Sequence, residues 1–295
     1  AHALSSPVRL RILSMIDDKP LIISELSKKL KLPLSTTAVA VGVLEEAGLV
    51  ISTTKPGTHG MQKLCALKVD SLFMQIKNAL HSNDESVIVE QMPIGNYCDF
   101  QVCAPCGILS ENAFLSAEDH VYGFYLPERS QAQLIWFTAG YLEYRFSTFR
   151  LRRNDVLQQI EFSFELCSEA PGYNDEWRSD ITVWLNGEEI GLIRSEGDYG
   201  DHRGRLNPVW WDDNNTQHGL MHTITIDASG TRLDQTLYPE YAIDRIDPFT
   251  QDALSLKIGV KQDAQYVGGV NLFGEKFGDY PQSIVMRALF QSEQE

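Results

Sequence analysis

The chain has 295 residues, of which 43% are hydrophobic, and a net charge of −15 at pH 7. This length allows two domains, and the absence of any run of about 18 apolar residues excludes a membrane-spanning helix. The charge is uneven, with a net of +4 in residues 1–80 and −19 in residues 81–295, which favours nucleic-acid binding at the first end only.

The first part of the chain predicts a helix-turn-helix. A first helix begins at Ser6, because serine is a good N-cap and the proline that follows suits the first helical position. A short second helix ends at the break over residues 31–33. A third helix runs from an N-cap at Ser35 to about Ala47, with a glycine just past its end. A short helix, a three-residue break and a capped helix together place the last helix in a major groove.

A two-stranded hairpin follows the third helix and completes a winged helix-turn-helix. Residues 49–53 and 61–67 are its strands, and the glycines and proline of residues 55–60 favour a turn between them. Spacing along the third helix predicts a core face of Thr37, Val41 and Leu44. The opposite face and the wing supply the DNA-contacting candidates. These are Ser35, Thr36, Thr37, Val39, Ala40, Lys55, His59 and Lys63.

Two motifs in this region resemble the ArsR family of winged-helix regulators. Residues 3–13 read ALSSPVRLRIL, which is similar to the family opening ALSDPTRLRIL, and residues 44–50 read LEEAGLV, which is similar to its L-x-E-A-G-L-V motif. The resemblance covers roughly residues 1–80. It implies a homodimeric, DNA-binding transcription regulator, usually a repressor that an effector releases from DNA.

The sequence departs from this family in two ways. Ala38, Val39 and Ala40 stand where many members carry Ser, Arg and His, so few hydrogen bonds to base edges are expected. Residues 30–48 contain no Cys or His, and therefore the metal sensing of some members is not carried over. The last helix, residues 69–80, has an apolar stripe that predicts the homodimer seam. Packing of this stripe against the first helix of the same chain is the alternative.

The pattern changes after a polar linker at residues 81–86. We expect domains at residues 1–81 and 87–295, the second an all-β sandwich of the jelly-roll type, so that the fold is multidomain α + β. Strands are predicted where apolar and polar residues alternate or where β-formers gather. Their ranges are 86–92, 132–138, 141–149, 157–166, 180–185, 222–227, 254–260 and 284–290.

Residues 180–191, DITVWLNGEEIG, resemble the V-W-V-N-G-x-x-V-G hairpin of galactose-binding-like jelly rolls. These modules recognise sugars in many glycosidases, so the resemblance implies a small-molecule effector that is a carbohydrate. Aromatic faces beside carboxylates and amides suit such a ligand. The ligand-binding candidates are Asp175, Glu176, Trp177, Trp210, Trp211, Asp212 and Asn271. The alternative is that the tryptophans fill the core and the Asp and Asn residues form turns.

A cysteine cluster and a histidine pair contain residue types that bind metals. Cys98, Cys103 and Cys106 have the spacing C-x4-C-x2-C, which makes them weak candidates for a metal or redox site. His218 and His222 are four residues apart but lack the remaining cupin pattern, so no cupin enzyme is inferred. An odd number of cysteines favours reduced thiols and the cytoplasm.

The sequence therefore predicts a cytoplasmic transcription regulator that binds double-stranded DNA as a homodimer. A small ligand, a sugar in the preferred interpretation, controls it through the second domain. We expect no catalytic residues, no cofactor, no resident metal and no membrane partner. The alternatives are a carbohydrate-active enzyme and a thiol- or metal-responsive switch, each with a fused winged-helix head.

Overall fold

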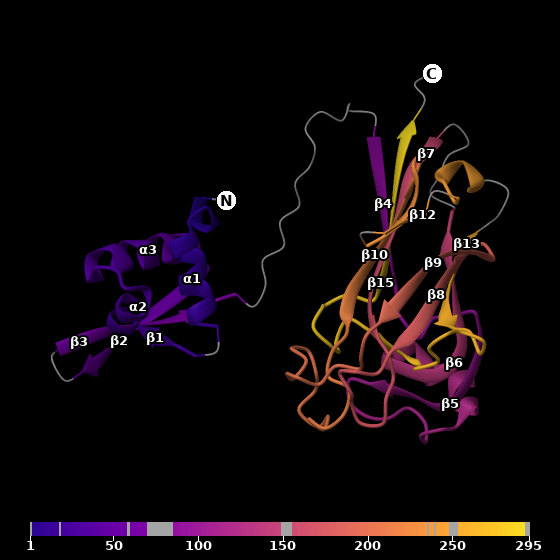
Figure 1. Cartoon of the computed structure of the whole chain (residues 1–295), viewed down its shortest axis with the longest axis horizontal. Helices are drawn as coiled ribbons and strands as arrows, with labels where there is room; N and C mark the ends of the chain where they lie inside the picture. Colours follow the sequence, from indigo (N-terminus) through magenta and orange to yellow (C-terminus); the bar gives the residue numbers. More distant parts are fainter. Residues whose placement is uncertain are drawn as a thin grey trace. The chain divides into compact units, whose positions relative to one another are not determined.

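The computed structural model describes residues 2–17, 19–57, 60–69, 85–148, 155–234, 236–238, 240–247 and 253–292. The chain divides into two compact units, Ala1–Asn78 and Ala79–Glu295 (Figure 1). Each unit has a hydrophobic core of its own. Among the described residues, no helix is both long and apolar enough to cross a membrane.

The first unit is a winged helix-turn-helix. Its core is formed by apolar side chains of the helices and the sheet, with Ile12, Leu26, Val41 and Leu44 fully buried. The small sheet has the strand order β1-β3-β2. The elements in chain order are η1 (His2–Leu4), α1 (Pro7–Met15), β1 (Leu21–Ile22), α2 (Ile23–Leu30), α3 (Leu34–Glu46), β2 (Val50–Gly57) and β3 (Gly60–Leu67).

The turn between α2 and α3 lies at residues 31–33, as the sequence predicts, but the caps differ. α2 closes with Lys31 in the left-handed conformation at φ 54°, and α3 begins at Leu34 with Pro33 as its N-cap. Ser35 therefore lies inside the first turn of α3 and is not the cap. Gly48, with φ 73°, follows the end of α3 and permits the reversal into β2, because a left-handed backbone suits glycine.

The wing is longer than the sequence pattern indicates. β2 pairs antiparallel with β3 from Val50 opposite Leu67 to Gly57 opposite Gly60. Lys55 therefore lies on a strand and not in the tip, which contains residues 58 and 59. His59, a predicted DNA contact, lies outside the described residues, and so do residues 70–80 of the predicted dimer helix.

The second unit is a sandwich-like all-β body with short 3-10 turns, as predicted. The turns are η2 (Val121–Tyr125), η3 (Pro127–Gln131) and η4 (Ile243–Arg245). The strands are β4 (Glu85–Met92), β5 (Asp99–Ser110), β6 (Ala132–Ser147), β7 (Asp155–Cys167), β8 (Ser179–Leu185), β9 (Glu188–Ser195), β10 (Leu220–Asp227), β11 (Gly230–Leu233), β12 (Thr236–Tyr238), β13 (Ala253–Val260), β14 (Val270–Phe273) and β15 (Ile284–Ser292).

Two runs of antiparallel strands enclose the core. One run has the order β4-β15-β7-β10-β11-β12, and the other has the order β5-β6-β13-β8-β9. The short strand β14 pairs with both β6 and β7 and so joins the runs. Alternate residues of β7, from Ile160 to Leu166, are fully buried between them. The alternation predicted for this strand is confirmed.

The structure corrects two details of the predicted strands. Residues 132–147 form one strand, β6, where two were expected. Gly140 lies at its middle with φ 110°, and a Cβ atom there would meet the carbonyl oxygen of Gln101 on β5. Alternation along residues 157–166 predicts that Glu165 points to the face opposite the buried residues, and it does, but it is fully buried because loops cover that face at the end of β7. The predicted Asn186–Gly187 turn does connect β8 to β9.

Candidate functional site

The outward face of α3 carries small and aliphatic side chains. Ser35 and Thr36 are exposed, and 70% of the surface of Val39 is accessible, whereas Val41 and Leu44 anchor the opposite face in the core. Two hydroxyl groups and an isopropyl group can reach base edges and thymine methyl groups, but they offer no bidentate contact with a base. Recognition by this face would depend more on shape and apolar contact than on hydrogen bonds.

Two of the predicted DNA contacts on α3 are wrong. Thr37 is fully buried, and its hydroxyl group donates a hydrogen bond to the carbonyl oxygen of Pro33 over 3.1 Å. Ala40 is only 9% exposed. Thr37 lies one turn before the core residue Val41, and Ala40 lies one turn before Leu44, and positions four apart share a helix face. They support α3 from inside and cannot contact a groove.

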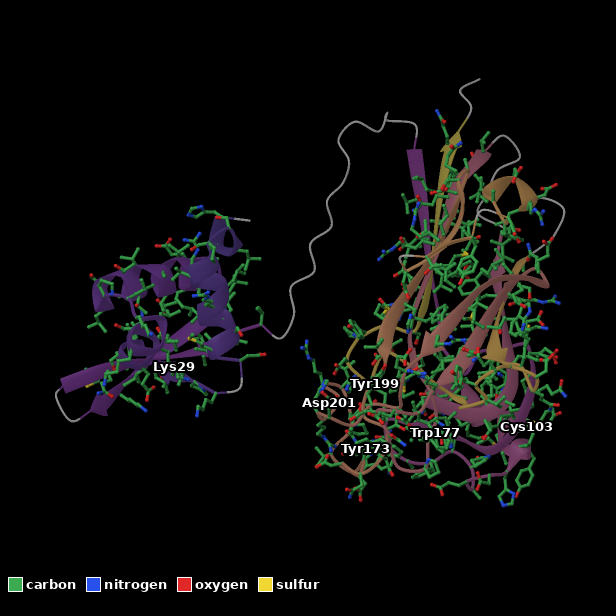
Figure 2. All side chains as sticks on the ribbon, in the orientation of Figure 1. Lys29, Cys103, Tyr173, Trp177, Tyr199 and Asp201 are labelled. Atoms are coloured by element: carbon green, nitrogen blue, oxygen red, sulfur yellow. The ribbon has the colours of Figure 1, made fainter. Side chains whose placement is uncertain are left out.

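Sequence reasoning missed three exposed lysines at the end of α2 and in the turn before α3. Lys29 is exposed at the end of α2 (Figure 2). Lys28 beside it is also exposed, and so is Lys31 in the turn before α3. Exposed lysines can neutralise DNA phosphates. The sequence signal for them was the presence of three lysines within four residues. Lys55 on the wing is also exposed.

Lys63, the other described wing cation, is paired within the unit. Its ammonium group lies 2.6 Å from the carboxylate of Glu45, which also accepts a hydrogen bond from Ser52. Burial alone would raise the pKa of Glu45, but the hydrogen bonds from Lys63 and Ser52 hold it below 4.5. This pair connects the end of α3 to the wing and leaves Lys63 with less charge to offer a phosphate.

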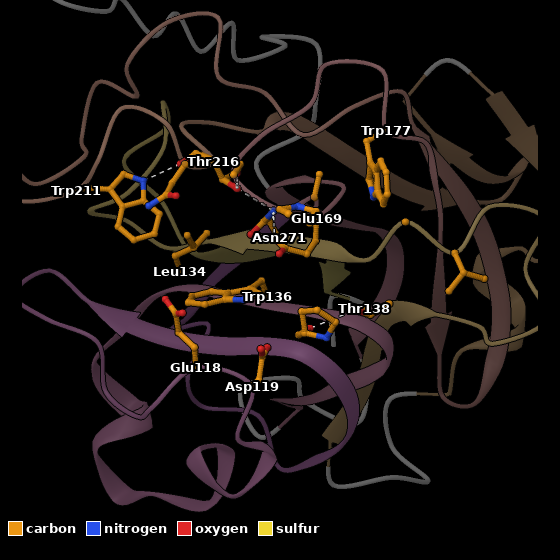
Figure 3. Close-up of a pocket in the computed structure, with 17 residues that line it drawn as sticks. Glu118, Asp119, Leu134, Trp136, Thr138, Glu169, Trp177, Trp211, Thr216 and Asn271 are labelled. Carbon is orange, nitrogen blue, oxygen red and sulfur yellow. Dashed lines mark hydrogen bonds between the residues drawn. The ribbon is translucent and has the colours of Figure 1, made fainter.

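A cavity of about 450 Å³ opens among the loops of the second unit (Figure 3). It is lined by three indole rings, three carboxylates and several amide or hydroxyl groups. The polar and aromatic residues of the lining are Glu118, Asp119, Trp136, Thr138, Glu169, Trp177, Trp211, Asn215, Thr216 and Asn271. They come from β6, β14 and the loops that follow β5, β7 and β9, so they gather from five separate parts of the sequence.

The polar end of this pocket is built around Asn271 on β14. Its Nδ2 donates hydrogen bonds to the carbonyl oxygen of Ser168 and to the carboxylate of Glu169, each over 2.8 Å. Its Oδ1 is buried and has no hydrogen-bond partner among the described residues. A buried acceptor without a donor costs free energy, so this atom is ready to accept a hydrogen bond from a ligand.

Two carboxyl groups near Asn271, the half-buried Glu169 and the buried Asp198, have raised pKa values. Burial and the neighbouring charge of Asp198 raise the pKa of Glu169 to about 8. Burial raises the pKa of Asp198 to about 7, against the hydrogen bonds that it accepts from Ala170 and Thr216. At neutral pH Glu169 is therefore mostly protonated, and its hydroxyl group can act as a donor.

The aromatic floor of the pocket is formed by Trp136 on β6. Its ring covers Gly107 on the neighbouring strand β5, where a Cβ atom would lie 2.2 Å from the ring. Trp211 is 7% exposed, and its indole N–H donates to the carbonyl oxygen of Thr216 over 2.8 Å. Trp177 lies on a loop and is 39% exposed. The floor is fixed by packing, whereas Trp177 stands at the rim.

The predicted ligand-binding residues divide into three groups. Trp177, Trp211 and Asn271 line the pocket together. Asp175 and Glu176 instead line a second hollow with Arg178, Glu196 and Tyr266, and Trp177 borders this hollow as well as the pocket.

Trp210 and Asp212 have other partners. The indole N–H of Trp210 donates to the carbonyl oxygen of Glu111 over 2.8 Å, and Asp212 accepts hydrogen bonds from Asn214 in a local turn. For Asp212, the alternative of a turn residue holds. Glu169, Trp136 and Thr216 were missed, because nothing in the local sequence marks them as neighbours of Asn271.

The cysteine cluster is not brought together as a metal site. Cys98 contacts the carbonyl oxygen of Glu143, Cys103 accepts from Gln262, and Cys106 is buried. The described residues do gather one group of metal-type donors, and it consists of Asp201, His202 and His218. His222 is not part of it and pairs with Asp234 over 2.8 Å.

Comparison with known proteins identifies the first unit. A family model described as a helix-turn-helix domain matches residues 4–53, which extend from η1 into β2. No curated protein matches the chain. The matched segment contains α2, the turn and α3, so the chain carries a helix-turn-helix domain of the DNA-binding type at its first end.

Similar solved structures include HlyU from Vibrio cholerae N16961, with 28% identity, 23% of this chain and 71% of that chain covered, and a TM-score of 0.21. Dimeric latent PorU from Porphyromonas gingivalis has 11% identity, with 83% of this chain and 18% of that chain covered, and a TM-score of 0.30. The Agl-KA catalytic domain has 8% identity, with 72% of this chain and 27% of that chain covered, and a TM-score of 0.24. This chain thus spans less than a third of the last two, and scores this low do not establish a shared fold.

Proposed function

We propose that this protein is a transcription regulator of the ArsR type, in which α3 and the β2–β3 wing bind an operator. The observation that carries the proposal is the helix-turn-helix domain at residues 4–53 with the outer face of α3 exposed. Lys31 lies in the turn directly before α3, and Lys28 and Lys29 are exposed at the end of α2, so these cations would contact phosphates. The acidic second unit would be repelled by a duplex and would stay away from it.

The regulator acts as a homodimer in this proposal. One module with so few cations binds a duplex weakly, and two modules that contact successive major grooves about 34 Å apart bind far more tightly. The predicted seam is residues 69–80. Sedimentation of the full chain tests this step, because a monomer at micromolar concentration that still binds one operator tightly would contradict it.

The effector pocket is the cavity around Asn271. A neutral ligand with several hydroxyl groups fits it, because hydroxyl groups can donate to Asn271 Oδ1 and accept from protonated Glu169, while Trp136 and Trp177 offer faces to C–H groups. The resemblance of residues 180–191 to galactose-binding-like modules supports a sugar. A tenfold change in operator affinity requires only about 1.4 kcal/mol of difference in ligand binding between the two states. Repression relieved by the sugar is the expected direction.

The DNA-binding step is tested with duplexes enriched from a random pool by the full chain, followed by fluorescence anisotropy. Val39→Glu adds a negative charge to the exposed face of α3 and should weaken binding at least tenfold. Val209→Glu makes the same change at a residue of the second unit that is 98% exposed, and should bind like the unaltered protein. Equal binding by the two variants, or no enrichment at low salt, would overturn the proposal.

Glycoside hydrolysis is the second candidate. Glu169 is protonated at neutral pH, and Glu118 and Asp119 line the same pocket, so an acid and a carboxylate are both present. We favour binding without turnover, because the resemblance of residues 180–191 is to a sugar-recognising module. Release of product from a panel of glycosides, lost in Glu169→Gln, would favour the enzyme.

A further inference from the structure

A second polar site lies outside the ligand pocket, in the loop between β9 and β10. Asp201 Oδ1 is 3.1 Å from Nδ1 of His202 and 2.8 Å from Nε2 of His218. The two imidazole rings are stacked, with centroids 3.9 Å apart. One nitrogen from each histidine and one carboxylate oxygen all lie within 4.8 Å of one another. Figure 2 shows Asp201 beside Tyr199, whose ring stacks on His218.

The other nitrogen of each ring has a partner outside the group. Nε2 of His202 is 3.0 Å from the carboxylate of Asp279, and Nδ1 of His218 is 3.2 Å from the carbonyl oxygen of Gly219. Histidines that bind metals have this arrangement, in which the distal nitrogen donates to a carboxylate or a backbone carbonyl and thereby fixes the tautomer. The nitrogen of each ring that remains faces Asp201.

The positions of the three ligand atoms also suit a cation between these groups. His202 Nδ1 and His218 Nε2 both face the same carboxylate oxygen of Asp201. A divalent cation at this point can be shared by all three atoms.

Further hydrogen bonds hold the surroundings in place. The buried carboxylate of Glu165 accepts hydrogen bonds from the backbone N–H groups of Gly219, Asp279 and Tyr280 over 2.8–3.0 Å. The other oxygen of Asp279 accepts from the N–H group of Arg205 over 3.1 Å. Glu165 thus fixes the backbone beside His218 and at Asp279, and the N–H group of Arg205 holds the Asp279 carboxylate behind His202.

We propose that His202 Nδ1, His218 Nε2 and Asp201 Oδ1 bind a divalent transition-metal cation of the Zn²⁺ class, with Asp279 orienting His202. Two imidazoles and one carboxylate are donors that Zn²⁺ prefers. Bonds of about 2.0–2.1 Å put ligand atoms at most about 4.2 Å apart, so small side-chain rotations close the set. Because 62% of the Asp201 side chain is exposed, the remaining position is open to solvent.

The cation would also act on the ligand pocket. The loop that holds Asp201 and His202 also carries Trp211 and Thr216, both of which line the pocket. His218 is at the end of this loop, and Asp279 is on the loop between β14 and β15. A cation at the site therefore restrains the loop that forms one wall of the pocket. The site does not depend on the proposed operator binding.

The test is calorimetric titration of ZnCl₂ into the full chain, prepared without a polyhistidine tag. We expect one site per chain, and at least tenfold weaker binding in His202→Gln and in Asp201→Asn. His222→Gln is the matched control, because His222 has an equivalent contact with Asp234 outside the group and should leave affinity unchanged. No binding by the unaltered chain, or equal losses in His202→Gln and His222→Gln, would overturn the proposal.

Cobalt spectroscopy identifies the ligands independently of affinity. Co²⁺ bound by nitrogen and oxygen gives visible absorption without a thiolate charge-transfer band, and Cys103→Ser should not change the spectrum. A thiolate band that is lost in Cys103→Ser would place the cation at the cysteines and contradict the proposal. Asp201 is exposed, so Asp201→Asn should keep its fold, and its circular dichroism without metal should match that of the unaltered chain.

Discussion

The amide of Asn271 donates a hydrogen bond to the carboxylate of Glu169 over 2.8 Å, although the two residues are 102 positions apart in the chain. Asn271 is on β14, and Glu169 follows the end of β7, with which β14 pairs. This contact sets the polar end of the pocket, because it occupies the amide nitrogen and turns Oδ1 toward a position without a donor.

Glu169 should make the stability of the second unit depend on pH. Its pKa is about 8 in the folded chain against 4.5 for an ordinary glutamate, so the folded state holds a proton that the unfolded state releases. Stability should therefore fall as pH rises from about 4.5 to 8. Glu169→Gln should flatten this decline by more than about 1.4 kcal/mol, the value of one pKa unit.

Urea unfolding of the full chain at pH 5 and pH 8 measures this effect. Glu176→Gln, in an exposed loop nearby, is the control and should retain the decline. An equal slope in Glu169→Gln and the unaltered chain would show that Glu169 is not the source.

Trp177 should contribute aromatic contact with the ligand, and its side chain can be removed without damage to the fold. Trp177→Ala should weaken binding of a sugar found by screening at least tenfold, because a rim indole stacks on the ligand and is 39% exposed without it. Trp210→Ala is the matched control, since Trp210 is 40% exposed and bonded to Glu111 outside the pocket lining. Titration calorimetry compares them, and equal losses would point to a different site.

Lys29 should contribute to DNA affinity as a point charge. Lys29→Ala should weaken binding to all duplexes alike and reduce the slope of log K against log salt by about 1. Lys276→Ala removes an exposed lysine of the second unit and should leave the slope unchanged. Anisotropy titrations over a range of salt concentrations give both slopes. A loss of sequence preference in Lys29→Ala would mean that Lys29 contacts bases.

Leu44 should be essential to the first unit alone. Leu44→Ala removes a fully buried side chain from between α3 and the sheet and should destabilise this unit by about 2–5 kcal/mol. The second unit has a separate core, so its unfolding transition should not move. Differential scanning calorimetry resolves the two transitions. Leu34→Ala is the control, because Leu34 is 56% exposed, and it should shift neither unfolding transition by a comparable amount.

Local patterns in the sequence were sufficient to predict the elements whose structure depends on residues a few positions apart. The rows of apolar residues in α2 and α3, the break between them and the Asn186–Gly187 turn all appear in the structure where they were expected. Period-2 alternation likewise located β7. Each of these signals involves neighbours within a few positions, where helical or extended geometry decides which side chains share a face.

Features that depend on contacts between residues far apart in the chain could not be predicted from the sequence. Thr37 was both a core residue and a DNA contact on sequence grounds, and only the packed helix shows that it faces Pro33. Glu165 follows the outward alternation of β7, yet loops more than fifty positions away bury it. β14 has only four residues in a glycine-rich stretch, too short for any periodicity. The pocket depends on this strand, and so its polar end could not be assembled beforehand.

Because β14 pairs with both β6 and β7, the floor of the pocket tolerates amino-acid substitution less well than its wall. Asn271 is in register with Trp136 and Cys167, so any alteration of this floor disturbs two strands at once. The surrounding wall comes from loops, which tolerate substitution and insertion. A change of ligand preference would therefore arise through Glu118, Trp177 and their loops. The floor that β14 forms with its two neighbouring strands would stay the same.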